Sequence, residues 1–140
     1  MMNKTFRLFD HTADLGVEVF GETETALFAH AALALVALTT DLEKIASVTE
    51  RHFSIQGADR TDLFINFLRE ILYLMNGEGF LPCEVHFDEF QPGFLRVKIR
   101  GESIDAGKHM IYKEIKAVTY HQASVEQTRK GWKGRVICDV

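Results

Sequence analysis

The sequence predicts an α+β fold in a single domain of residues 1–140, with a mainly antiparallel or mixed β-sheet that carries two main helices. Three observations support this prediction. A chain of 140 residues and 15.9 kDa has room for one sizeable core. Segments with alternating apolar residues outnumber the two segments with helical periodicity, and they dominate the second half. Because strands and helices do not alternate strictly, a doubly wound sheet is the weaker alternative.

The first half of the chain predicts two strands followed by a helix. Residues 5–9 and 15–20 alternate between apolar and polar side chains, as half-buried strands do. Thr23 is a suitable N-cap for a helix over residues 24–38, because its hydroxyl can accept a hydrogen bond from the first turn. The apolar residues of this segment form a wide stripe, so we expect much of the helix to be buried.

The middle of the chain predicts a third strand and the second helix. Residues 48–56 carry Phe53 and Ile55 on one face of a strand. Asp59 or Thr61 then caps a helix that runs to Met75, with Leu63, Phe67 and Ile71 in one stripe.

The second half predicts hairpins around one irregular segment. Residues 91–93 form a turn between two strands, and residues 101–112 are polar and irregular. The strands expected here are residues 83–90, 94–100, 115–121, 124–128 and 135–139.

Composition and charge exclude several classes of function. Hydrophobic residues make up 46% and charged residues 26%, as in ordinary globular domains. The net charge of −4 argues against nucleic acid as a direct ligand. Residues 96–140 nevertheless hold ten Lys and Arg against five Asp and Glu, which suits either a partner surface or solvated strand faces.

Targeting and redox signals are those of a cytoplasmic protein. The first residues contain no apolar segment of the kind that directs export, and the longest apolar run, residues 31–38, is too short to cross a bilayer. We therefore expect a cytoplasmic location and no membrane partner. Cys83 and Cys138 are far apart and outside any Cys-x-x-Cys spacing, which predicts free thiols.

Nucleotide-binding loops, zinc-protease motifs and serine nucleophile elbows are missing from the sequence, and three places remain for chemistry. The first is the polar turn His11-Thr12-Ala13-Asp14 between the first two strands. A rigid scaffold can present such side chains for function. The alternative is a structural turn in which Asp14 and Thr12 bond nearby backbone N–H groups.

The second place is the end of the sequence, at Asp139 and Val140. A terminal strand would hold the Asp139 side chain close to the main-chain carboxylate of Val140. Two such anions repel each other unless a cation lies between them, and hard oxygen ligands suit Ca²⁺, Mg²⁺ or Mn²⁺. The alternative is a solvated terminus without a ligand.

The third place is the segment of residues 115–121. On a strand, Lys116, Val118 and Tyr120 would share one face, while His121 would lie on the other. A lysine on an otherwise buried strand needs an anionic partner or a path for its ammonium group to solvent. His121 is more typical of a hydrogen-bonded structural histidine than of a ligand.

These three places together resemble the archease family. The resemblance rests on His11-Thr12-Ala13-Asp14-Leu15-Gly16, on Ile115-Lys116-Ala117-Val118-Thr119-Tyr120-His121 and on the final Val136-Ile137-Cys138-Asp139-Val140, and it covers essentially the whole chain. It implies a small α+β protein that is not itself an enzyme. Archeases are protein cofactors of the GTP-dependent RNA-splicing ligase, which acts in tRNA splicing and RNA repair. They promote its guanylylation and turnover.

The resemblance also implies a site. Asp14, Asp139 and Val140 would bind a divalent cation, calcium in crystals, with magnesium or manganese as alternatives. Lys116 and His11 would contact phosphate or the partner. The partner would be the ligase, and RNA would be met only through it. Where the family often has Pro after its Gly-Glu pair, this chain has Ser103, which affects a loop more than the site.

Two other functions remain open from the sequence. A small metal-dependent phosphoester hydrolase would act without a partner. A general chaperone, or a modulator of tRNA-modifying enzymes, would expose a sizeable apolar patch.

Overall fold

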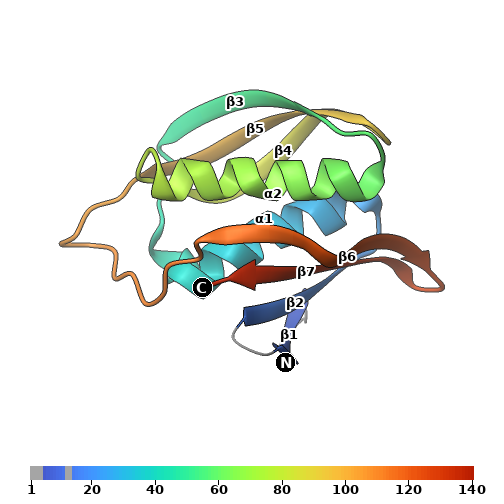
Figure 1. The fold of residues 1–140 in the computed structure, drawn as a ribbon. Helices are drawn as coiled ribbons and strands as arrows, with labels where there is room; N and C mark the ends of the chain where they lie inside the picture. Colours follow the sequence, from blue (N-terminus) through green and yellow to red (C-terminus); the bar gives the residue numbers. More distant parts are fainter. Residues whose placement is uncertain (1–4, 12–13) are drawn as a thin grey trace.

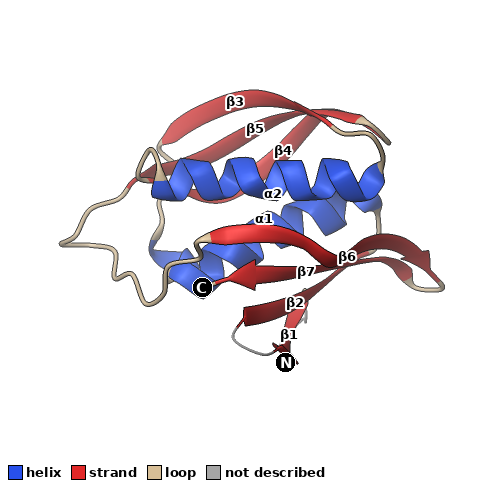
Figure 2. Ribbon diagram, viewed as in Figure 1, coloured by secondary structure: helices blue, strands red, loops and turns tan. Residues whose placement is uncertain are grey.

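In the described part of the chain, seven strands form two antiparallel sheets, and the helices α1 and α2 lie between them (Figures 1 and 2). The computed structural model describes residues 5–11 and 14–140, without the side chains of Asp10 and His11. The four-stranded sheet has the order β1 (Phe6–His11), β2 (Asp14–Gly21), β7 (Gly131–Asp139) and β6 (Ala117–Thr128). The three-stranded sheet has the order β3 (Thr49–Gln56), β5 (Phe94–Ser103) and β4 (Phe80–Gln91). The α+β class with antiparallel strands is confirmed. The division of the strands between two sheets is a new finding.

The two helices begin where the sequence predicts. α1 (Glu24–Thr39) is capped by the Thr23 hydroxyl, which accepts a hydrogen bond from the Ala26 N–H at 3.1 Å. α2 (Arg60–Asn76) is capped by Asp59, and Thr61 lies inside the helix. A short 3-10 helix, η1 (Leu42–Lys44), follows α1.

The position of α1 between two sheets explains its composition. A helix that is covered on both sides must be apolar around most of its circumference rather than along one stripe. The buried residues of α1 accordingly include neighbours such as Leu27 and Phe28, Ala31 and Ala32, and Leu35 and Val36. The expected burial of this helix is confirmed.

Phenylalanine side chains join the helices to the three-stranded sheet. The Phe28 ring of α1 lies 5.0 Å from the Phe64 ring and 5.8 Å from the Phe67 ring of α2, centroid to centroid. It also lies edge-on to Phe90 of β4 at 4.8 Å. Aromatic residues therefore fill the core.

One predicted pair of strands is a single strand in the structure. β6 runs continuously over Ala117–Thr128, but its register against β7 shifts between Thr119 and Ser124. Within this bulge Gln122 has a φ of 56°, in the left-handed region that residues other than glycine rarely adopt. The bulge interrupts the apolar alternation, so sequence analysis divides the strand in two.

The segment between β5 and β6 has no regular structure, as its polar composition predicts, although β5 extends to Ser103 rather than ending at residue 100. Cys83 and Cys138 are free thiols, as expected. Among the described residues, no helix has the length and apolar content needed to cross a membrane.

Candidate functional site

The strand register gathers the predicted site residues at one end of the four-stranded sheet. His11 pairs with Asp14 across β1 and β2, Leu15 pairs with Cys138 across β2 and β7, and Ala117 pairs with Asp139 across β6 and β7. Asp14 precedes Leu15 on β2 and Asp139 follows Cys138 on β7, so continuing the antiparallel register by one residue places Asp14 opposite Asp139. Because side chains alternate between faces, these two aspartates share the outer face of the sheet, whereas Leu15 and Cys138 face the core.

The end of the sheet that holds Asp14 and Asp139 is called the acidic end. It affects the pKa of the Cys138 thiol. Burial raises its pKa to about 12, and the negative charge of Asp14 adds to the rise. The carboxylate of Asp14 therefore lies close enough to Cys138 to disfavour a second negative charge there.

Lys116 lies beside the end of β7, but not on a buried strand as predicted. β6 begins only at Ala117, and Lys116 is exposed, whereas Val118 is buried. The Lys116 N–H donates to the Asp139 carbonyl at 2.7 Å, which fixes its backbone next to the acidic end. Its ammonium group is therefore available to an anion from solvent or from a partner.

A groove of about 430 Å³ starts at Lys116 and runs between α2 and β6. Arg69 of α2 also lines it. The Arg69 Nε donates to the Val118 carbonyl at 3.1 Å, and the guanidinium lies 4.6 Å from the centre of the Tyr120 ring. The two charged side chains that line the groove, Arg69 and Lys116, are basic, which places positive charge beside the end of the sheet that holds Asp14 and Asp139.

The donor chemistry of the acidic end fits a hard divalent cation. Asp14 and Asp139 supply carboxylate oxygens, which Ca²⁺, Mg²⁺ and Mn²⁺ prefer. The third predicted ligand, Val140, packs its side chain against the core. Among the described residues, no group of three or more His, Cys, Asp or Glu side chains is arranged to hold a metal. The predicted set has two such side chains, with the Val140 carboxylate as its third member. The side chain of His11 lies outside the described residues.

Sequence analysis missed a cluster of salt bridges on the same outer face of the sheet. Glu18 of β2 is only 5% exposed and lies between Arg7 of β1 and Arg135 of β7 in the register. Its carboxylate accepts from Arg7 Nε at 2.5 Å and from Arg135 Nη1 at 3.2 Å. The hydrogen bond from Arg7 lowers the pKa of Glu18. The signal in the sequence is the pair of arginines, Arg7 and Arg135, that lie opposite Glu18, but it becomes visible only once the pairing of these strands is known.

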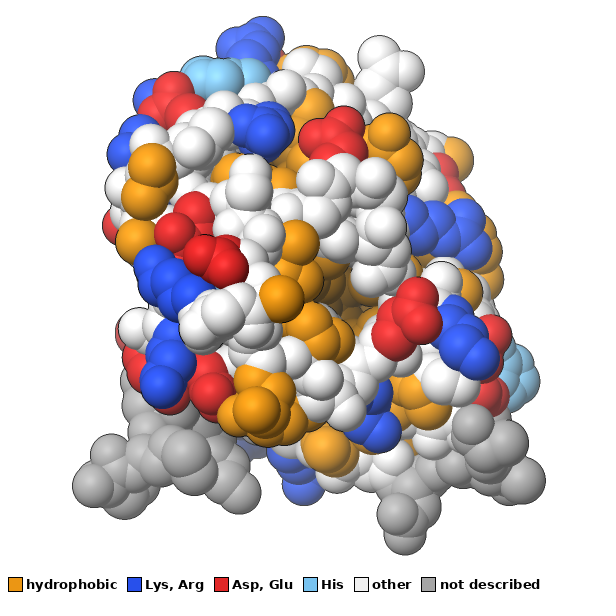
Figure 3. Space-filling view, turned by 90° about the vertical axis from the view of Figure 1, so that its left-hand side faces the viewer, with side chains coloured by type: hydrophobic (Ala, Val, Ile, Leu, Met, Phe, Trp, Pro, Cys, Tyr) orange, Lys and Arg blue, Asp and Glu red, His pale blue; other side chains and the backbone are white. Residues whose placement is uncertain are grey.

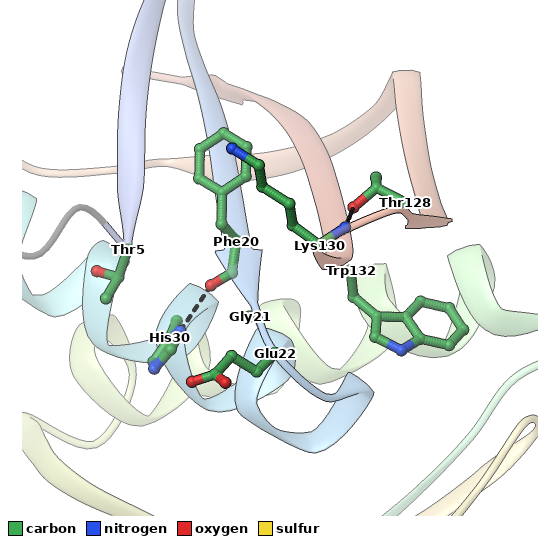
Figure 4. Close-up of a pocket in the computed structure, with 8 residues that line it drawn as sticks. All are labelled: Thr5, Phe20, Gly21, Glu22, His30, Thr128, Lys130 and Trp132. Carbon is green, nitrogen blue, oxygen red and sulfur yellow. Dashed lines mark hydrogen bonds between the residues drawn. The ribbon is translucent and has the colours of Figure 1, made fainter.

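A second cavity, of about 410 Å³, lies at the opposite end of the same sheet (Figure 4). It is lined by Trp132, which pairs with Gly21 across β2 and β7. His30 Nδ1 donates to the Phe20 carbonyl at 2.6 Å, which fixes the ring at its wall. The length of β2 separates this cavity from Asp14, so it is not part of the acidic end.

Two antiparallel sheets around a pair of helices, with two aspartates and a lysine at one sheet end, define a small α+β protein with a candidate cation site. The model of the Archease protein family (MTH1598/TM1083) matches residues 6–140. The chain belongs to the archease family.

Known relatives and solved structures are similar to this chain over almost its whole length. The chain is 31% identical to protein archease of Pyrococcus abyssi, over 98% of this chain and 99% of that protein. It is 34% identical to protein archease of Methanosarcina mazei, over 98% and 97%. The solution structure of Methanobacterium thermoautotrophicum protein 1598 superposes with a TM-score of 0.80 at 32% identity, over 97% of this chain and 99% of that one. The Thermotoga maritima archease, described as a possible chaperone, superposes with a TM-score of 0.62 at 24% identity, over 100% and 98%, and supports the fold alone.

Proposed function

We propose that this protein is a non-enzymatic cofactor of a GTP-dependent RNA-splicing ligase and promotes guanylylation and turnover of that enzyme in the cytoplasm. The observation that carries the proposal is the position of Asp14 next to Asp139, with Lys116 beside them, at one end of the sheet. Family membership supports the same conclusion.

The residues of this end have separable roles in the proposal. Asp14, Asp139 and the carboxylate of Val140 would hold a divalent cation. Such an ion supplies positive charge near phosphate oxygens, which phosphoryl transfer requires. Lys116 binds and orients a phosphate or an acidic partner group from its position directly before β6. Because strands hold Asp14 and Asp139, the end reaches the ligase with these charges already arranged, and little ordering is needed on contact.

The proposal is tested by multiple-turnover guanylylation and ligation with the cognate ligase, with and without this protein. We expect strong stimulation by the wild type and little by Asp14→Asn or Asp139→Asn. The matched control is Glu126→Gln, which removes an exposed acid of β6 near the other end of the same sheet. Stimulation by both aspartate variants would refute the site, whereas no stimulation by the wild type would refute the function.

Cation binding has its own readout. Thermal unfolding with Ca²⁺, Mg²⁺ or Mn²⁺ should show stabilisation of the wild type and of Glu126→Gln, but not of Asp14→Asn, because a ligand that binds only the folded state raises stability by mass action. A residue added after Val140 should weaken the effect, since it converts the carboxylate of Val140 into a peptide group.

The other two functions make different predictions. A phosphoester hydrolase would turn over substrate in the absence of the ligase. A general chaperone would suppress aggregation of unrelated proteins, and Asp14→Asn would not impair it.

A further inference from the structure

The segment of residues 104–116, between β5 and β6, exposes an unusual amount of apolar surface. Of the eight large hydrophobic side chains that are exposed in the described part of the chain, four lie here. Their exposed fractions are 43% for Ile104, 64% for Met110, 42% for Ile111 and 60% for Tyr112. Tyr and Met are enriched at protein interfaces, and a cluster of such side chains on a surface marks a contact site.

A carboxylate holds the base of this segment in place. One oxygen of Glu102 accepts three hydrogen bonds, from the Ala46 N–H at 2.8 Å, Lys108 Nζ at 2.7 Å and His109 Nε2 at 2.9 Å. The side chain of His109 is completely buried, and its Nδ1 accepts from the Asp105 N–H at 3.0 Å. His109 is therefore the neutral Nε2–H tautomer, bonded at both nitrogens.

The exposed half of the segment is tied to the end of α1. The Thr40 hydroxyl donates to the Met110 carbonyl at 2.6 Å, and the Tyr112 N–H donates to the Thr39 carbonyl at 2.8 Å. The Tyr112 hydroxyl donates to Asp41 at 2.8 Å. The apolar side chains are thus exposed from a fixed backbone, which reduces the entropy lost when a partner binds them.

The same segment leads into the acidic end of the sheet. It continues through Lys116, whose N–H is bonded to Asp139. Figure 1 shows the segment projecting from the end of the molecule at which β7 finishes. Figure 3 looks onto that end, where hydrophobic side chains reach the surface among charged ones. A protein that contacts Asp14 and Asp139 there has this segment beside it.

We propose that Met110, Ile111 and Tyr112 are a docking anchor that binds an apolar pocket on the same ligase, and that the acidic end acts only after this anchor has bound. This inference rests on the proposed function. A projecting segment needs a concave counterpart, and two copies of one convex surface cover each other poorly. The anchor therefore fits a different protein better than a second copy of this chain.

The experiment separates docking from activation. Met110→Ser is compared with wild type by titrating each into the guanylylation assay and by direct calorimetric binding to the ligase. We expect Met110→Ser to raise both the half-stimulating concentration and the Kd by about tenfold, with an unchanged plateau, as is typical of an interface anchor. Asp14→Asn should show the opposite pattern, with a lower plateau and nearly unchanged binding.

Two further variants control the interpretation. Leu8→Ser removes an apolar side chain of similar exposure from β1, the opposite edge strand, and should leave the half-stimulating concentration within about twofold, as surface changes outside an interface do. Glu102→Gln keeps the three apolar side chains but weakens the support of the segment, so it should also reduce affinity.

The possible results separate the docking anchor from the proposed function. An unchanged affinity of Met110→Ser would refute it while leaving the proposed function intact. A wild-type protein that dimerises through this segment, and that becomes monomeric on Met110→Ser, would assign the surface to a second copy. A wild type that binds the ligase without stimulating it, together with weaker binding by Met110→Ser, would refute the proposed function and retain the anchor. A wild type that neither binds nor stimulates it would refute both.

Discussion

Two donors to the same carboxylate oxygen, one buried and one exposed, should contribute very differently to stability. His109 and Lys108 both donate to Glu102 Oε2, but the His109 side chain is completely buried, whereas that of Lys108 is 44% exposed. His109→Ala removes a hydrogen bond to a charged acceptor, which is typically worth about 1.5–3 kcal/mol, and also removes a packed imidazole. We expect it to lower the free energy of unfolding by about 3 kcal/mol. Lys108→Ala should change it little, because solvent and entropy offset exposed ion pairs.

Urea unfolding followed by circular dichroism measures this difference. With a slope of about 1.5 kcal/mol per molar urea, 3 kcal/mol corresponds to a shift of about 2 M in the midpoint for His109→Ala. Equal shifts for the two variants, or a shift below about 0.5 M for His109→Ala, would refute the view that the buried donor holds the segment. The slope itself should stay constant if only the folded state is affected.

Three further predictions follow from the core and the segment. The pKa of Glu102 is about 2 instead of 4.5, chiefly because of the Ala46 N–H. Its contribution to stability is therefore complete above pH 4.5 and is lost as the pH falls through 2, so wild type and Glu102→Gln should converge in acid unfolding curves. Phe28→Ala should lower the free energy of unfolding by about 3–5 kcal/mol in the same urea assay, since the ring is fully buried among other phenylalanines. Cys138 should resist alkylation at neutral pH in the native protein and react after unfolding, as mass spectrometry of the labelled peptides would show, because burial raises the pKa of its thiol.

Local signals predict much of the fold. The caps Thr23 and Asp59 mark the helix starts because capping depends on a few neighbouring atoms. The hairpin turn at residues 91–93 is likewise local, and it joins β4 to β5. Placing both helices between two sheets requires knowledge of which strands pair, and strand pairing joins residues as distant as Leu15 and Cys138.

The candidate site could likewise be predicted only in part from the sequence. The family resemblance predicts Asp14 and Asp139 as a pair, and they are the direct chain neighbours of Leu15 and Cys138, the pair at the end of the register of β2 and β7. Lys116 was expected on a buried strand, but β6 starts one residue later, and strand ends are the least predictable part of a pattern. The burial of Glu18 between two arginines was missed, because charged residues in a half-polar strand normally indicate a solvent-facing side.

The position of β7 affects how the protein forms during synthesis. β7 is the last strand in the sequence, yet it lies between β2 and β6. While the ribosome still holds β7, the hairpin of β1 and β2 lacks its inner neighbour, and β6 lacks the strand with which it pairs. Asp14 and Asp139 therefore meet only when the sheet closes, and incompletely synthesised chains do not assemble the acidic end.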